Sequence, residues 1–148
     1  APTGAGVQLG ATHSQSFETW LAEVPGMKVV CPSTPYDALG LMRSAIKDDN
    51  PVLVAEPALL YGAKGEVPDE YYEIEIGKAD ITREGSDITL VSYGYGMRPV
   101  NDAADTLEGR GVSVEVIDMR SLSPIDMDTI VASVQKTNRD GGFGSTGT

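Results

Sequence analysis

The sequence predicts an α/β protein with parallel-type sheets and flanking helices. Short runs of β-branched and other apolar residues alternate along the chain with longer segments whose apolar residues recur at helical spacing. A strand, a helix and a strand in this order favour parallel pairing, because the helix supplies the crossover that parallel strands need. Of the 148 residues, 41% are hydrophobic and 22% are charged, as in soluble globular domains, so the chain can build a core.

The first predicted element is a helix that follows the glycine-rich residues 1–12. Ser14 or Ser16 can cap its first free N–H groups. Four apolar residues at spacings i, i+3, i+4 and i+7 would form one apolar face: Phe17, Trp20, Leu21 and Val24. Pro25-Gly26 then ends the helix.

The next three elements form a strand–helix–strand unit. Apolar runs at 27–31 and 52–55 predict two buried strands. Between them we expect a helix over 35–47, since Thr34 is a good N-cap and Pro35 fits the first helical position.

A polar connector and a second α/β unit complete the predicted fold. Residues 56–78 indicate an exposed linker, which is the best candidate for a domain boundary. Beyond the linker, three short runs predict strands at 80–83, 87–93 and 112–116. In the last run, valines alternate with polar residues. Two further helices are predicted, one from the spacing of Val100, Ala103, Ala104 and Leu107 and one from Ser123-Pro124 onward.

The charge and the cysteine count argue against several classes of protein. Acidic residues outnumber basic residues by 22 to 11, which gives a formal net charge of −11. Such a surface repels phosphate backbones and anionic lipids, so nucleic acid and membranes are poor partners. The single cysteine, Cys31, excludes an internal disulfide and a cysteine-based zinc site. The start at Ala1 and the glycine-rich tail lead us to expect a piece of a longer chain.

Two polar groups could carry chemistry, and the residues alone leave both open. His13, the single histidine, lies between the glycine-rich segment and a helix start, where an imidazole could relay protons or simply form loop hydrogen bonds. A serine hydrolase is a weak alternative, because Ser14 is adjacent but no G-x-S-x-G elbow is present. Asp48 and Asn50 follow a predicted helix end whose carbonyl groups carry partial negative charge, so they could hold a hard cation or merely stop the helix.

Two further motifs have simple structural interpretations. Gly94-Tyr95-Gly96 is half of a dinucleotide-binding loop, but the third glycine is missing, so a turn between a strand and a helix that needs small residues is the favoured explanation. Asp118 and Arg120 close a predicted strand and indicate an ion pair at a domain interface.

Three longer stretches are more specific than these short patterns. They are GATHSQSFETWLAEVPGMKVVCPSTPYDALGLMRSAIKDDNPV at 10–52, EPALLYGAKGEVP at 56–68 and VSVEVIDMRSLSPID at 112–126. In this order they resemble the β subunit of the thiamine-diphosphate-dependent decarboxylating component of 2-oxo acid dehydrogenase complexes, of the pyruvate, acetoin or branched-chain type. With the pieces between them, they cover the chain from about residue 2 to Arg139.

The resemblance implies a transketolase-like fold in two partial domains. Residues 1–75 are similar to the later part of the pyrimidine-binding domain, and residues 76–148 are similar to part of the transketolase C-terminal domain. The implied activity is oxidative decarboxylation of a 2-oxo acid on thiamine diphosphate, with acyl transfer to lipoamide. The implied partners are an α subunit, which holds the diphosphate and Mg²⁺ in a heterotetramer of two α and two β subunits, and the lipoyl acyltransferase. The bacterial cytoplasm or the mitochondrial matrix is the implied compartment.

The same resemblance assigns roles to particular residues. His13 falls on the active-site histidine of the family's H-S-Q motif, which implies proton donation and hydrogen bonding. Asp48 and Asn50, with the carbonyl groups of Ala45 and Ile46, fall on a monovalent-cation site that usually holds K⁺ in the family.

The chain also departs from the family pattern. The family's glutamate that activates the aminopyrimidine falls before residue 1, and a GGFG stretch follows Arg139 as though a strand had been deleted. We therefore expect this chain by itself to be inactive. Two alternatives stay open: another transketolase-like thiamine enzyme, such as a deoxyxylulose-phosphate synthase, and a non-catalytic α/β interaction module. The run PSTPYDA at 32–38 favours the separate β subunit over the single-chain enzyme.

Overall fold

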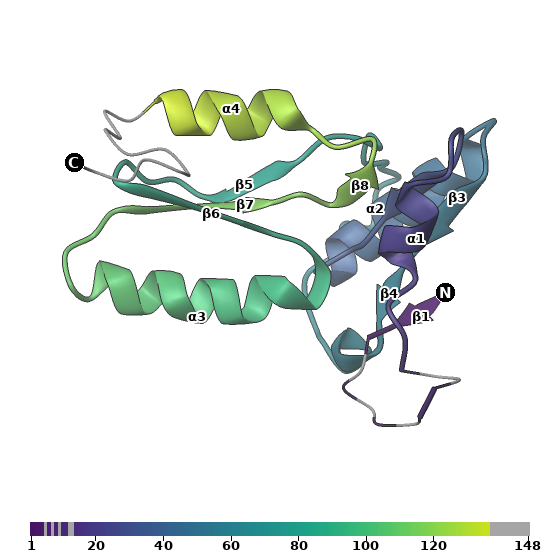
Figure 1. Ribbon diagram of the computed structural model, residues 1–148, viewed down its shortest axis with the longest axis horizontal. Coiled ribbons are helices and arrows are strands. Elements are labelled where there is room, and N and C mark those ends of the chain that lie inside the picture. The colour runs from purple at the N-terminus through teal and green to yellow at the C-terminus, as the bar shows by residue number, and fades with distance from the viewer. Residues whose placement is uncertain (5, 7, 9, 12–13, 137–148) are drawn as a thin grey trace.

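The computed structural model describes residues 1–4, 6, 8, 10–11 and 14–136. These residues form two three-stranded sheets and a two-stranded ladder with helices packed against them (Figure 1). The strands are β1 (Pro2–Thr3), β2 (Lys28–Val30), β3 (Val52–Val54), β4 (Glu56–Pro57), β5 (Asp80–Arg83), β6 (Ile88–Ser92), β7 (Val114–Asp118) and β8 (Ser121–Ser123). The helices are α1 (Glu18–Ala22), α2 (Pro35–Lys47), α3 (Met97–Glu108) and α4 (Met127–Gln135), with 3₁₀ turns η1 (Ala58–Leu60) and η2 (Gly94–Gly96).

The predicted strand–helix–strand unit is confirmed. Strands β2 and β3 pair in parallel, and α2 crosses over between them. The helix begins at Pro35, and the Thr34 hydroxyl accepts a hydrogen bond of 3.1 Å from the backbone N–H of Asp37. Four buried side chains form the core of this unit: Val30, Leu41, Val54 and Ile74. The N-terminal signals of α2 therefore give the helix boundary that the sequence predicts.

The helix after the glycine-rich segment is shorter than expected, and its predicted apolar face is wrong. Trp20 is 68% exposed and Val24 is 45% exposed. Glu18 is buried instead, because its Oε2 atom accepts a hydrogen bond of 2.6 Å from the buried hydroxyl of Thr3. A carboxylate can lie inside a protein when a polar partner replaces water in this way.

The connector at 56–78 is partly buried, which the sequence did not predict. Strand β4 pairs in parallel with β1. Further along, Ile74 is 7% exposed and packs in the core beside Leu41. The Ser44 hydroxyl donates to the carbonyl of Ile74 at 2.6 Å, and the N–H of Ile74 donates to the carbonyl of Gly40 at 3.3 Å. The end of the connector is therefore bound along α2.

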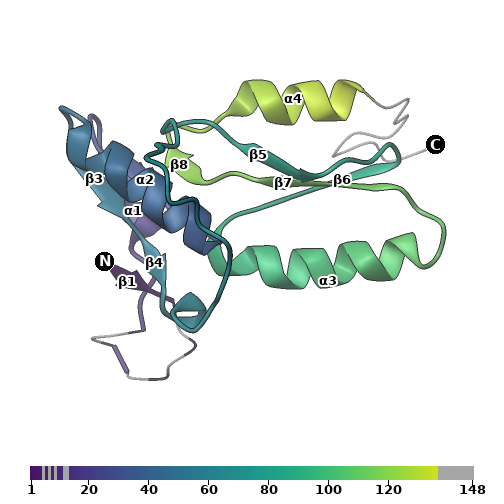
Figure 2. The same cartoon turned by 180° about the vertical axis from the view of Figure 1, so that it is seen from behind.

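The second sheet lies between two helices. Its strand order is β5-β7-β6, and helices α3 and α4 cover opposite faces, as the two opposite views show (Figure 1, Figure 2). Strand β7 is parallel to β6 and antiparallel to β5. The sheet around β2 has the same plan, since β2 is parallel to β3 and antiparallel to β8. The parallel pairs are as expected, and each of the two three-stranded sheets also has one antiparallel edge strand.

Strand β7 is buried along its whole length, even at its polar residues. Glu115 is 0% exposed, although the alternation of valine and polar residues places it among the polar ones. The hydroxyl of Ser133 donates to its carboxylate, and the ammonium of Lys136 lies 3.5 Å from Oε2. Because α4 supplies Ser133 and its C-cap supplies Lys136, this helix compensates the buried charge of β7.

Strand β8 connects the two halves of the chain. It follows β7 in sequence, yet it pairs antiparallel with β2 in the other sheet, with Ser121 opposite Val30. The predicted helix at Ser123-Pro124 therefore starts later than expected, because Ser123 belongs to this strand. Helix α4 begins at Met127, after Asp126, whose carboxylate caps the backbone N–H of Thr129 at 3.2 Å.

Arg120, between β7 and β8, makes the charged contacts that hold this connection. Its backbone has a φ of 53°, in the left-handed region, and its carbonyl accepts a hydrogen bond of 2.8 Å from the N–H of Cys31. Its Nη2 atom lies 2.7 Å from Oδ1 of the buried Asp37 and 3.0 Å from Oδ2 of Asp80. An interface ion pair is thus present at Arg120, but its acids are Asp37 and Asp80, whereas Asp118 accepts a hydrogen bond from the backbone N–H of Arg120.

Among the residues that the structure describes, no helix is both long and apolar enough to cross a membrane.

We predict that Arg120→Leu destabilises the protein by about 3–5 kcal/mol, because the substitution leaves the carboxylate of Asp37 buried without its cation. Lys47→Met is the matched control, since it removes an ion pair with Glu73 at the surface, and it should change stability only slightly. Urea denaturation of both variants measures the difference. Equal free energies of unfolding for the two variants would contradict the role assigned to Arg120.

Candidate functional site

His13 lies outside the described residues, but the two ends of its segment, residues 3–4 and 15–18, are described. We call these two ends the base of the segment. The backbone N–H of Gly4 donates to the carbonyl of Gln15 at 3.0 Å, and the hydroxyl of Thr3 donates to the carboxylate of Glu18. These bonds hold residues 3–4 against residues 15–18, so both ends of the segment that carries His13 are fixed to the fold. The sequence does not indicate this buried position of Glu18, because a glutamate in the first turn of a helix is expected in solvent.

A cavity of about 360 Å³ lies beside this base and reaches the second half of the chain. Its lining includes Glu18, Cys31, Tyr93 and Tyr95. Burial, together with the neighbouring carboxylates of Glu18 and Asp118, raises the pKa of the Cys31 thiol to about 12. The thiol therefore stays protonated at neutral pH and is a poor nucleophile, which leaves thiolate chemistry out of this cavity.

The four residues of the predicted cation site lie at the end of α2. Ala45 and Ile46 belong to its last turn, and the backbone beyond Lys47 is extended, so their carbonyl groups lack partners within the helix, whereas the carbonyl of Ser44 accepts from the N–H of Asp48. Asp48 and Asn50 follow directly, and the side chain of Asn50 donates to Oδ1 of Asp48 at 3.0 Å. The oxygen donors that the sequence predicts are therefore close together along the chain.

Lys28 is a neighbour of this group that the sequence did not indicate. Its ammonium lies 2.5 Å from Oδ2 of Asp48. The hydrogen bond from Lys28 is the main reason that the pKa of Asp48 is lowered to about 2, and Asn50 adds two further hydrogen bonds. The carboxylate is thus ionised at neutral pH and already neutralised by a cation of this chain. Within the described residues, no group of three or more His, Cys, Asp or Glu side chains is placed to hold a metal ion.

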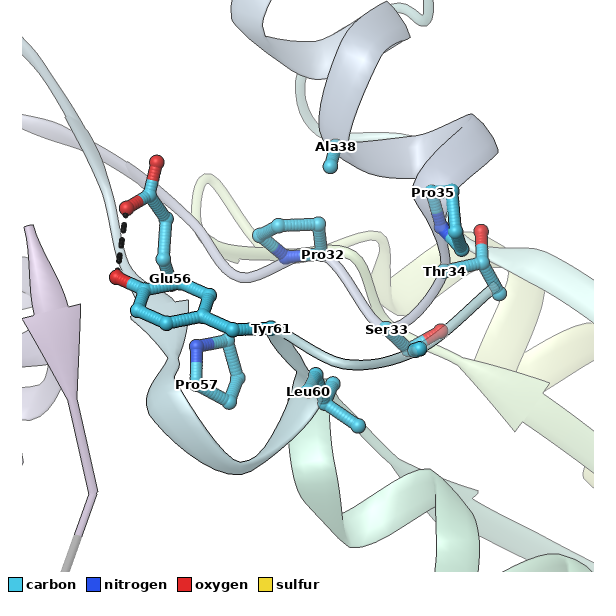
Figure 3. A pocket seen from close by; sticks show the side chains of 10 residues that line it. Pro32, Ser33, Thr34, Pro35, Ala38, Glu56, Pro57, Leu60 and Tyr61 are labelled. Atoms are coloured by element: carbon cyan, nitrogen blue, oxygen red, sulfur yellow. Dashed lines mark hydrogen bonds between the residues drawn. The ribbon is translucent and has the colours of Figure 1, made fainter. Parts of the chain in front are cut away.

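Another pocket lies where the parallel strands β2 and β3 end (Figure 3). Residues 32–34 come shortly after β2, and Glu56 comes after β3 with only Ala55 between them. The first turn of α2 and the turn η1 close its other sides. Open α/β sheets commonly bind ligands outside the carboxyl ends of their strands, so the position favours a binding role.

A buried acid lies next to this pocket, at the contact between the two halves. Asp118 is 1% exposed, and it accepts hydrogen bonds from the Ser33 hydroxyl and from the backbone N–H of Arg120. Burial raises the pKa of Asp118 to about 6, and the bonds from Ser33 and Arg120 oppose that rise.

Gly94, in the half dinucleotide motif, has a φ of 52°, and a Cβ there would lie 2.6 Å from Sγ of Cys31, so the turn needs glycine for structural reasons.

Comparison with protein families divides the chain in two. Residues 1–64 match the transketolase pyrimidine-binding domain, and residues 77–140 match the transketolase C-terminal domain. The expected domain limits of 1–75 and 76–148 stay a prediction, since the matches leave the connector unassigned.

Individual relatives agree with this division. The chain is 51% identical over 140 residues to the pyruvate dehydrogenase E1 component subunit beta of Bacillus subtilis, covering 94% of this chain and 43% of the relative. It is 47% identical over 139 residues to the acetoin:2,6-dichlorophenolindophenol oxidoreductase subunit beta of Cupriavidus necator, covering 94% of this chain and 41% of the relative. The chain thus spans about two-fifths of the length of these relatives.

A solved structure shows the same arrangement of elements. A split-gene transketolase, described as an inactive β4 tetramer, matches with a TM-score of 0.74 and 28% identity over 91% of this chain and 43% of that chain. A transketolase mutant from Pichia stipitis matches with a TM-score of 0.57 and 19% identity over 80% of this chain and 18% of that chain, which shows the fold alone.

We predict that Asp118→Asn changes the pH dependence of stability. The folded-state pKa of Asp118, about 6, lies above its ordinary value, so the folded wild type loses stability as the pH rises toward and through 6. Asparagine does not ionise, so the stability of the variant relative to the wild type should improve by about 1 kcal/mol between pH 5 and pH 7.5. Urea denaturation at both pH values measures this difference.

Glu23→Gln, which removes an exposed acid, is the control and should follow the wild-type profile. Parallel stability profiles for the wild type and Asp118→Asn would show that Asp118 has an ordinary pKa.

Proposed function

The chain belongs to the transketolase-like proteins, and on this basis we propose that it is part of the β subunit of a 2-oxo acid dehydrogenase. The observation that carries the proposal is about 50% identity to β subunits of pyruvate and acetoin enzymes over more than nine-tenths of this chain. The proposed reaction is oxidative decarboxylation of a 2-oxo acid, with transfer of the acyl group to lipoamide. These relatives favour the dehydrogenase subunit over a deoxyxylulose-phosphate synthase.

The proposed cofactor is thiamine diphosphate, which would supply a stabilised carbanion for decarboxylation. The match of residues 1–64 to a pyrimidine-binding domain supports this choice. The position of the segment that carries His13 also fits, because the segment leaves the carboxyl end of β1, beside the parallel strand β4. An α subunit would hold the diphosphate and Mg²⁺, and a lipoyl acyltransferase would accept the product.

The role proposed for His13 is to donate a proton and a hydrogen bond from its imidazole during the reaction. An imidazole with a pKa near neutrality can give a proton and recover it within one cycle. The hydrogen bonds that Thr3 and Gly4 make with the carbonyl of Gln15 bring the two described ends of this segment together, which supports a site here. A compartment in the bacterial cytoplasm or the mitochondrial matrix accords with this activity.

We propose that the monovalent-cation site at the end of α2 binds K⁺ only weakly. Ala45, Ile46, Asp48 and Asn50 offer the carbonyl, carboxylate and amide oxygens that suit K⁺. The ammonium of Lys28 competes for the same carboxylate, which argues against tight binding by this chain.

We predict that His13→Ala slows turnover by about 10²–10⁴-fold in the full-length subunit assembled with its α subunit, because the variant loses a proton-transfer group. The melting temperature of the assembly should stay unchanged, since the helix and strands beside this segment are held by other residues. The rate of acyl transfer to lipoamide and the melting temperature are measured together. A well-folded variant assembly with the wild-type rate would remove His13 from the mechanism, and a lower melting temperature with a normal rate would assign it a structural role.

We also predict that exchanging K⁺ for tetramethylammonium at equal ionic strength shifts the Tm of the wild-type chain by less than about 2 °C, because Lys28 already neutralises Asp48. Lys28→Met frees the carboxylate, so K⁺ should raise the Tm of this variant clearly more than that of the wild type. The control is Lys64→Met, which removes an exposed lysine that forms no ion pair with Asp48. A large K⁺ effect in the wild type would show that Lys28 does not compete for the site.

A further inference from the structure

The pocket at the carboxyl ends of β2 and β3 combines apolar walls with one carboxylate (Figure 3). Its volume is about 290 Å³, at the lower end of the range for small-molecule sites and suited to a single side chain. The apolar part of the lining comes from α2, β4, η1 and adjacent loops and consists of Pro32, Pro35, Ala38, Pro57, Leu60 and Ala63. These residues offer a contact surface for a hydrocarbon stem, and they supply no hydrogen bond through their side chains.

Glu56 places its carboxylate at the edge of this apolar surface. Its backbone is fixed, because its N–H donates to the carbonyl of Ala1 at 2.8 Å and the residue pairs with Pro2 in the ladder of β1 and β4. The hydroxyl of Tyr61 donates to Oε2 of Glu56 at 3.1 Å, which orients the carboxylate beside the aromatic ring (Figure 3). In the described part of the chain, no lysine or arginine forms an ion pair with Glu56.

The surroundings of the pocket resemble a protein contact surface. Tyr61 is 62% exposed, and the nearby Leu59 and Val67 are 42% and 38% exposed. Exposed aromatic and aliphatic side chains around a small pocket are typical of a protein interface, in which one anchor residue fills the pocket. Residues 56–70 carry four carboxylates and a single lysine, so the complementary surface is cationic.

We propose that this pocket receives an arginine side chain from a partner protein. The guanidinium group forms a charged hydrogen bond with Glu56 and stacks on the ring of Tyr61, while its methylene groups lie against the prolines. Arginine fits better than lysine because its planar group can contact a carboxylate and an aromatic face together. This assignment uses neither the cofactor nor His13, so it goes beyond the proposed enzymatic function and stands independently of it.

The test is an NMR titration of this chain with N-acetyl-arginine methylamide, a blocked arginine that mimics a residue within a peptide. We expect saturable shifts that cluster at the amides of Ala38, Leu60 and Ala63. The citrulline analogue has a similar shape but no charge and should bind at least ten-fold more weakly. Glu56→Gln should weaken arginine binding by at least ten-fold, and the control Glu23→Gln, at the exposed acid that follows α1, should leave it unchanged.

Several results would overturn the proposal. Shifts that do not saturate, or that spread over the acidic surface, would show that the arginine probe binds without a site. Equal binding to the wild type and to Glu56→Gln would remove the carboxylate from recognition. Binding of free L-arginine ten-fold more tightly than the blocked derivative would assign the pocket to a metabolite instead of a partner protein. If the assembled protein proved to have no dehydrogenase activity, the arginine titrations could still be measured and would still test this proposal.

Discussion

The connection between the two halves of this chain centres on the contacts of Arg120, which accompany the pairing of β8 with β2. Its backbone carbonyl bonds to the N–H of Cys31, and its guanidinium group contacts Asp37 on α2 and Asp80 on β5. These contacts hold the end of β7 beside the end of β2, so β8 can pair with β2. An exposed ion pair would add little to stability, but Asp37 is 2% exposed, and a buried carboxylate depends strongly on its cation. The geometry of the junction therefore follows from a charge that cannot be left unpaired.

This connection also sets the surroundings of the candidate sites. Ser33 lines the pocket beside Glu56 and bonds to Asp118, which belongs to the second half. The cavity beside the base of the His13 segment has walls from both halves, with Glu18 from one and Tyr93 from the other. The shape of this cavity therefore depends on the contacts of Arg120 and β8. The pocket beside Glu56 is lined by residues of the first half, and it contacts the second half through the bond from Ser33 to Asp118.

The sequence predicts those elements whose signals are local. Helix α2 is an example, because Thr34 and Pro35 define its start within the chain itself. Strand β8 could not be predicted, since a short polar run becomes a strand only by pairing with β2. In the candidate cation site, too, the neighbours in sequence could be predicted and the remote partner could not. The oxygen donors around Asp48 are adjacent in sequence and were recognised together, whereas Lys28, 20 residues earlier, is brought to Asp48 by the fold. The buried position of Glu18 also depends on a remote partner.

Native-state amide hydrogen exchange tests most directly whether the two halves form one cooperative unit. Amides of β2 report on the first sheet, and amides of β7 report on the second. If the contacts of Arg120 and β8 join the halves, both sets should exchange through the same global opening, with free energies that agree within about 1 kcal/mol. Exchange of the β2 amides at a free energy several kcal/mol below that of the β7 amides would show that the first half unfolds separately, and it would contradict the central role of this connection.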